Sequence, residues 1–137
     1  MSMKQLDTLL KYEQEKVDRY AEQLKLAESE YQQNITRLQG VADYRLEYMK
    51  RLSQRAEQGL DSATYSHYHA FIAKLDQASS QVEIAMHQAK ALAEQSKTIW
   101  LQQRQKLKAV ELLRSQRVKK ANLAEQKIEQ KMFDEIA

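Results

Sequence analysis

The chain has 137 residues with no proline and only two glycines, so almost nothing in its sequence interrupts a helix. The one convincing turn signal lies at Gly59, which is followed closely by Asp61 and Ser62. Glycine can adopt the left-handed conformation that ends a helix, and Asp or Ser can accept hydrogen bonds from the free N–H groups that begin the next one. The sequence therefore predicts a chain that reverses direction once.

A single reversal predicts an all-α fold, an antiparallel hairpin of two helices that pack as a coiled coil with both chain ends at one pole. The predicted parts of this single domain, 1–137, are a helix over 3–57, a turn over 58–64 and a helix over 65–135. Folding back at the turn places residue 3 near residue 119 and leaves roughly the last 18 residues beyond the partner helix. Gly40 lies inside the first helix, which we expect to be continuous with a soft spot there, and the alternative is a kink.

Apolar residues recur at heptad spacing in the first half of the chain, which favours a left-handed coiled coil. The repeating positions are Leu10, Val17, Leu24, Tyr31 and Leu38. Polar residues at Asn34 and Arg45 interrupt this seam. The corresponding seam of the second helix is expected to contain Tyr65, Tyr68, Phe71 or Ile72, Leu75, Ala78, Val82, Met86, Ala89, Leu92, Ile99, Val110, Leu113, Ala121, Ala124, Ile128 and Met132.

The composition is typical of a long helix or coiled coil and not of a globule with a large core. Charged residues make up 30% of the chain and aromatic residues 7%, and there is no cysteine. The N-terminus becomes charged too soon for a signal peptide, and no apolar run approaches the length that spans a bilayer. We therefore expect a soluble intracellular protein without disulfides or a thiol nucleophile.

No residue pattern predicts catalysis, a cofactor or a metal site. His67 and His69 are two positions apart, so on a helix they point about 200° apart and cannot chelate one ion together. His87 follows Glu83 by four residues, which is an ordinary pair on a helix surface. The chain has no phosphate-binding glycine loop and no nucleophile elbow. The expected protein is not an enzyme.

Basic residues are concentrated between Lys97 and Lys120, where eight of them accompany one acidic residue, Glu111. On a helical wheel they fall on two sides, so they form a collar more than a stripe. A collar would suit a protein ring with an acidic lining, whereas the alternative is a solvated helix face. Nucleic acid is not an expected partner, because Trp100 offers only one stacking ring and no binding motif accompanies the charge.

Two apolar sets near the turn lie beside one another in the predicted hairpin. They are Val41, Tyr44 and Tyr48 on the first helix and Phe71, Leu75, Ala78 and Val82 on the second. Two helices can bury only part of so broad a cluster, which leaves one side open to a partner. The alternative is a coiled-coil core with isolated surface aromatics.

Three segments resemble the bacterial flagellar export protein FliJ family, a component of flagellar type III secretion. They are DYRLEY at 43–48, YHAFIAKLDQA at 68–78 and AEQKIEQKMFDEIA at the C-terminus. The resemblance covers almost the whole chain. It implies an antiparallel coiled coil similar to that of the gamma subunit of rotary ATP synthases, inserted into the central hole of a hexameric export ATPase and promoting its assembly and activity.

The resemblance also implies partners and the residues that bind them. Binding to the cytoplasmic part or linker of the export-gate membrane protein maps to Val41, Tyr44, Tyr48, Phe71, Leu75, Ala78 and Val82. The ATPase ring would meet Arg104, Lys108, Arg114, Arg117, Lys119 and Lys120. Export chaperones are further implied partners, and the implied location is the cytoplasm, peripherally associated with the inner membrane through partners at the flagellar base. A general chaperone or adaptor, or a self-associating structural coiled coil, stays open as the alternative.

Overall fold

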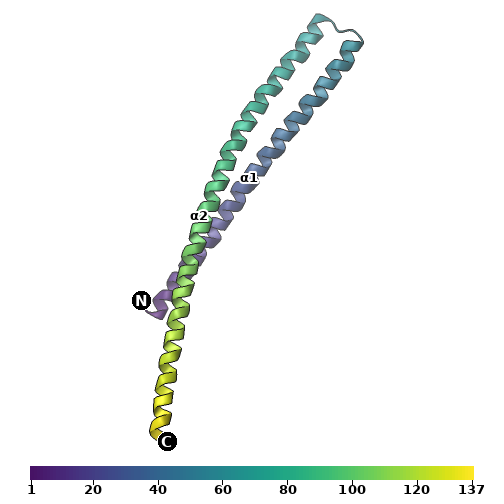
Figure 1. Cartoon of the computed structure of the whole chain (residues 1–137). Helices are drawn as coiled ribbons and strands as arrows, with labels where there is room; N and C mark the ends of the chain where they lie inside the picture. The colour runs from purple at the N-terminus through teal and green to yellow at the C-terminus, as the bar shows by residue number, and fades with distance from the viewer. The chain divides into compact units, whose positions relative to one another are not determined.

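A computed structural model describes all 137 residues of the chain, and it contains two helices and no strand. Helix α1 spans Met3–Glu57 and helix α2 spans Ser62–Ile136 (Figure 1). The two long helices pack against each other as a helical hairpin, which confirms the predicted fold class. The single reversal of the chain lies where the sequence placed it.

The turn is built by the residues that predicted it. Gly59 has a φ of 90°, the left-handed conformation that costs glycine little, and its N–H donates to the carbonyl of Ala56 at 3.2 Å. Asp61 caps α2 by accepting a hydrogen bond from the backbone N–H of Thr64 at 2.7 Å. Hydrogen bonds from the Thr64 side chain and then from its backbone lower the pKa of Asp61. This cap explains why α2 begins at Ser62, before the predicted residue 65.

Packing divides the chain into two units, and each helix contributes a segment to both. Unit 1 contains Met1–Gln23, at the start of the chain and of α1, together with Lys97–Ala137, which includes the second half of α2. Unit 2 contains Leu24–Ser96, including the turn. The expectation of one domain over 1–137 stays a prediction.

The seam of unit 2 is mostly apolar and follows the predicted heptad of α1. Its most buried side chains are Leu24, Ala27, Asn34, Leu52, Ile72, Ala89 and Ala93. Asn34 is only 4% exposed, and its side chain donates to the Glu30 carbonyl of its own helix at 3.0 Å. Arg45 reaches across to Asp76 with 2.6 Å between Nε and Oδ1. The two polar interruptions of the heptad are therefore satisfied, one within α1 and one across the pair.

The seam of unit 1 is more polar. Gln103 is 2% exposed, and its side-chain amide donates to the Glu13 carboxylate and, at 3.3 Å, to the Glu13 carbonyl. The indole Nε1 of Trp100 is buried without a hydrogen-bond partner. Asp7 and Arg114 pair across the helices at 2.6 Å, close to the register that placed residue 3 near residue 119. Leu6 and the other apolar seam residues therefore share unit 1 with a buried polar pair.

Four residues predicted for the part of the α2 seam that packs on α1 lie outside it, so the prediction was wrong there. Tyr65, Leu92, Ile99 and Leu113 are 50%, 54%, 38% and 44% exposed. The inner face of α2 instead runs through Ala85, Ala89, Ala93, Ser96, Trp100, Gln103, Leu107 and Val110. Ala89, Ser96, Gln103 and Val110 keep the seven-residue period, but the inner-face positions between them, Ala93, Trp100 and Leu107, follow their predecessors by four residues and not by three. Apolar side chains one place earlier then face outward.

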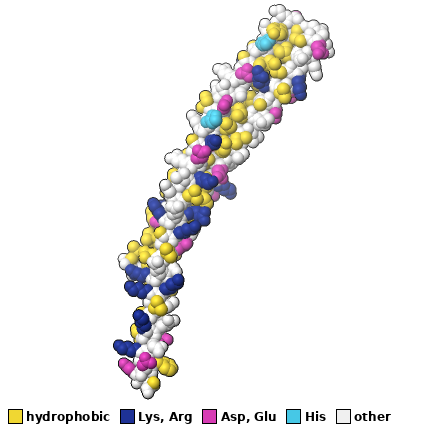
Figure 2. All heavy atoms as spheres, viewed as in Figure 1, with side chains coloured by type: hydrophobic (Ala, Val, Ile, Leu, Met, Phe, Trp, Pro, Cys, Tyr) yellow, Lys and Arg dark blue, Asp and Glu magenta, His cyan; other side chains and the backbone are white.

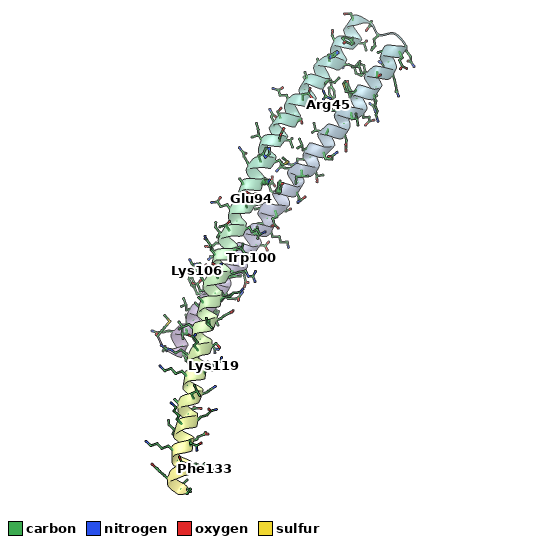
Figure 3. The ribbon with its side chains drawn as sticks, in the orientation of Figure 1. Arg45, Glu94, Trp100, Lys106, Lys119 and Phe133 are labelled. Atoms are coloured by element: carbon green, nitrogen blue, oxygen red, sulfur yellow. The ribbon has the colours of Figure 1, made fainter.

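The end of α2 has no helix beside it. Every residue from Lys119 to Ala137 is exposed, and Figure 1 shows the yellow end of α2 continuing past the N-terminus of the chain. Phe133 is 77% exposed on this segment (Figure 3). The predicted extension of the second helix beyond its partner is confirmed. Ala121, Ala124, Ile128 and Met132 continue the apolar row of the seam but cover nothing.

Candidate functional site

Four aromatic rings from both helices meet near the turn in unit 2, and we call them the aromatic cluster: Tyr44, Tyr48, Tyr68 and Phe71. The ring centroids of Tyr48 and Phe71 are 4.4 Å apart, and those of Tyr48 and Tyr68 are 5.0 Å apart. Tyr44 meets Phe71 edge-on at 6.0 Å. These separations are within the range of favourable aromatic pairs, so the rings support one another across the hairpin.

Exposure within the aromatic cluster is uneven. Tyr48, Tyr68 and Phe71 are half-buried, whereas Tyr44 is 46% exposed. Tyr44 lies outside the heptad phase of α1, which is why the seam does not enclose it. The cluster therefore presents an apolar surface with one ring standing at its edge, a geometry suited to contact with an apolar partner.

All seven residues predicted to bind the export gate belong to unit 2, and none of them is fully buried. The aromatic cluster brings together Tyr44, Tyr48 and Phe71 from that set. Val41, Leu75, Ala78 and Val82 are half-buried along the same seam. Tyr68 was not predicted as a site residue, although its position three residues before Phe71 places both on one face of α2.

Unit 1 carries the basic collar, which we define as the six residues predicted for the ATPase ring: Arg104, Lys108, Arg114, Arg117, Lys119 and Lys120. Figure 2 shows Lys and Arg side chains in dark blue along this part of α2. Arg114 is half-buried and pairs with Asp7, and the Arg104 guanidinium lies 4.8 Å from the centre of the Trp100 ring. These two side chains stabilise unit 1 itself.

The other four members of the basic collar are exposed and form no ion pair. They are Lys108, Arg117, Lys119 and Lys120. Unpaired surface cations that lie close together attract anionic partners and speed their encounter, and salt weakens the attraction. The collar therefore offers electrostatic binding to an acidic surface, and only part of the predicted set is free to provide it.

Neither helix assembles a group of three or more His, Cys, Asp or Glu side chains that could hold a metal ion. The Nε2 of His87 lies 3.8 Å from a Glu83 carboxylate oxygen on the exposed face of α2. No stretch of α1 or α2 has both the length and the apolar character needed to cross a membrane. The structure has two surfaces open to partners: the apolar surface of the aromatic cluster in unit 2 and the basic collar in unit 1.

Comparison with known proteins identifies the family that the chain matches. Residues 3–137 match the family described as flagellar FliJ protein. The chain is similar to the flagellar FliJ protein of Salmonella typhi, with 29% identity over 132 residues that cover 96% of this chain and 90% of the relative. It is also similar to the flagellar FliJ protein of Escherichia coli strain K12, with 29% identity over 106 residues that cover 77% of this chain and 72% of the relative. No solved structure matches it.

Proposed function

The chain belongs to the flagellar FliJ protein family, and on this premise we propose that it is a non-enzymatic coupling component of the flagellar export apparatus. In this proposal unit 1 inserts into the hexameric export ATPase and promotes its assembly and activity. The aromatic cluster of unit 2 binds the cytoplasmic part or linker of the export gate. Export chaperones are further partners, and any association with the inner membrane at the flagellar base occurs through the gate and the ring.

The observation that carries the proposal is the separation of two unlike surfaces into two units. Unpaired cations suit the acidic lining of a ring, because attraction between a collar and a lining does not require one rotational alignment. An aromatic surface suits a specific apolar contact, because rings bury much area at a low cost in side-chain entropy. One chain can therefore engage two partners through different physical forces.

The ring contact is tested by reversing the four unpaired cations of the basic collar to Glu. Arg104 and Arg114 are left in place, since they stabilise unit 1. We expect co-elution with the purified export ATPase to weaken about tenfold or more at low salt, with loss of stimulated ATP hydrolysis in the same fractions. The matched control reverses four exposed basic residues of unit 2, Lys25, Arg37, Lys50 and Lys74. Unchanged association of the collar variant across salt concentrations would remove the collar from the proposal.

The gate contact is tested at Tyr44, the exposed ring of the aromatic cluster. Tyr44→Ala should weaken binding to the cytoplasmic part of the gate protein while the helical content measured by circular dichroism stays the same. Tyr65→Ala is the matched control, because Tyr65 is 50% exposed in the same unit but makes no ring contact with the aromatic cluster. Equal binding by the two variants would contradict the assignment.

A second candidate function, a chaperone or adaptor, is favoured by the uncovered end of α2. Ala121, Ile128, Met132 and Ile136 form an exposed apolar row, and such a row can bind a partner helix. An adaptor of this kind would bind export chaperones without stimulating ATP hydrolysis by the hexamer. A self-associating coiled coil would use the same row to form a dimer, which light scattering would detect.

A further inference from the structure

A lysine followed four residues later by a leucine occurs three times in α2, at intervals of eleven residues. The pairs are Lys97 and Leu101, Lys108 and Leu112, and Lys119 and Leu123. Eleven residues make three helical turns with about 20° left over, so the three leucines lie within about 40° of one another around α2. We call these six residues the lysine–leucine row.

The lysine–leucine row lies entirely in unit 1 and faces away from the seam. Leu101, Leu112 and Leu123 are 42%, 60% and 57% exposed, and the three lysines are exposed as well. None of the lysines takes part in an ion pair. The buried seam residues Gln103 and Leu107 occupy the other side of the helix. Neither packing within the chain nor charge pairing therefore explains the row.

Between Lys97 and Lys120 no acidic side chain lies on this face. Glu111 is the one acidic residue between Lys97 and Lys120, and it lies about 100° around the helix from its neighbour Leu112. Gln105 and Gln116 are exposed and uncharged close to the line of the leucines. Between Lys97 and Lys120 the face thus combines regularly spaced apolar side chains with positive charge, and the acidic residues nearest to its line, Glu94 and Asp134, lie beyond its ends.

We propose that the lysine–leucine row binds the surface of a bilayer that contains anionic lipids, with α2 lying parallel to the membrane plane. Each leucine would enter the boundary between headgroups and acyl chains. Each lysine, one turn away, would lay its aliphatic stem beside the leucine and extend its ammonium group to a lipid phosphate. Positive charge near an anionic leaflet adds attraction to the apolar contact.

The spacing favours a lipid surface over another helix. A helix partner needs about two apolar residues in every seven to form a continuous seam, whereas this row supplies one leucine in every eleven. A planar surface requires no such continuity, because each leucine enters it independently along the roughly 33 Å between Leu101 and Leu123. Nucleic acid would engage the lysines and gain nothing from the leucines.

The inference goes beyond the proposed function. It also means that unit 1 cannot bind the ATPase ring and a bilayer at the same time. Lys108 and Lys119 belong both to the basic collar and to the lysine–leucine row. Figure 3 labels Lys119 on the part of α2 that would lie on the bilayer. A molecule held by the ATPase ring would be unable to present these two side chains to lipid.

The test uses the full chain and vesicles, with neither ATPase nor gate present, so its result is independent of the proposed function. Co-sedimentation is measured with vesicles of phosphatidylcholine and phosphatidylglycerol and with vesicles of phosphatidylcholine alone. We expect binding to the anionic vesicles only. The charge-neutral triple variant Leu101→Gln, Leu112→Gln and Leu123→Gln should weaken it about tenfold. The matched triple variant Leu26→Gln, Leu46→Gln and Ile84→Gln should not, although those side chains are 63%, 57% and 59% exposed in unit 2.

A second measurement reports depth of insertion and does not depend on how the triple variants fold. The chain has no cysteine, so Leu112→Cys and Leu46→Cys each provide a single site for an environment-sensitive dye. Anionic vesicles should shift the emission of the dye to the blue at position 112 and leave it unchanged at position 46.

Three outcomes would overturn the proposal. The first is that the wild-type chain fails to bind anionic vesicles. The second is that the two triple variants retain binding equally, which would show attraction by net charge alone. The third is that the dye at position 112 stays in water while the chain is bound.

Discussion

The two units use the same pair of helices but bury different kinds of side chain between them. In unit 2 the seam consists of apolar residues such as Leu52, Ile72 and Ala89, and its buried amide at Asn34 bonds within its own helix. In unit 1 the seam includes the Glu13 carboxylate, the Gln103 amide and an indole N–H without a partner. Buried polar groups cost stability unless they are fully satisfied. Unit 2 should therefore be the stable part of the hairpin and unit 1 the part that opens more readily to partners.

The largest expected effect comes from breaking the apolar seam of unit 2. Ile72 is 7% exposed, and Ile72→Ala should lower the free energy of unfolding by about 2–4 kcal/mol, because it removes buried methyl groups and leaves a cavity. Chemical denaturation followed by circular dichroism measures the change. Ile84→Ala is the control at a site that is 59% exposed, and it should cost far less. Equal losses at the two sites would mean that unit 2 has no stabilising seam.

The next effect tests the polar pair of unit 1. Gln103→Leu leaves the buried carboxylate of Glu13 without its side-chain donor and should cost about 1–3 kcal/mol. Adding Glu13→Leu removes both partners and should recover that loss or exceed it. Hydrogen exchange of the amides at 8–18 reports the opening of unit 1. A double variant as unstable as the single one would show that the polar pair does not weaken this unit.

The sequence predicted the structure correctly where one residue determines the local geometry. The prediction failed where either of two neighbouring faces of a helix could form the seam. Gly59 and Asp61 identified the turn, because a positive φ and a helix cap each depend on few atoms. The seam of α2 could not be traced in the same way past Ala89. Outward-facing leucines such as Leu92 follow the apolar pattern as well as Ala93 does, and only packing against α1 distinguishes them.

The candidate sites show the same limit. The register of the hairpin was enough to bring Tyr44, Tyr48 and Phe71 together, because paired segments follow from the position of the turn. The register did not reveal that Arg114 pairs with Asp7, since that depends on side-chain conformation and on the local approach of the helices. The partners of both surfaces stay predictions.

A smaller change in stability is expected from substitutions at the two glycines of unit 2, and it has opposite signs at the two positions. Gly40 lies within α1 with open space around it, so Gly40→Ala should raise the free energy of unfolding by about 0.5–1 kcal/mol through helix propensity. Gly59→Ala should lower it by about 1 kcal/mol or more, because the φ of 90° at this turn strains any other residue. Thermal unfolding measures both changes. Stabilisation by Gly59→Ala would contradict the left-handed turn.

A still smaller effect on stability is expected from the exposed ion pairs. One such pair joins the two helices in each unit. Arg45–Asp76 and Asp7–Arg114 both measure 2.6 Å between partly exposed side chains. Double-mutant cycles with alanine should give coupling energies below about 1 kcal/mol for each pair, and high salt should reduce both. A much larger coupling for Asp7–Arg114 would mean that unit 1 depends on this pair more than its exposure indicates.

The smallest effect concerns the turn, which unit 2 has and unit 1 lacks. The hydrogen bonds from Thr64 lower the pKa of Asp61, so the cap contributes stability above the ordinary aspartate range. This contribution is lost as the pH falls through the lowered pKa. Asp61→Asn keeps an oxygen acceptor but cannot titrate there. The melting temperatures of the two proteins should therefore converge or cross in acid, and a constant difference from neutral pH to pH values below that range would contradict the assignment.

The single reversal of the chain also orders events during synthesis. Arg45 and Asp76 are separated by 31 residues along the chain, whereas Asp7 and Arg114 are separated by 107. Short loops close at a lower entropic cost, so the hairpin should zip from the turn toward the termini. At translation rates of about 5–20 residues per second, the first helical segment to leave the ribosome spends roughly 5–20 s without its neighbour. The nascent N-terminal end of α1 thus stays without its partner helix longer than any other part of α1.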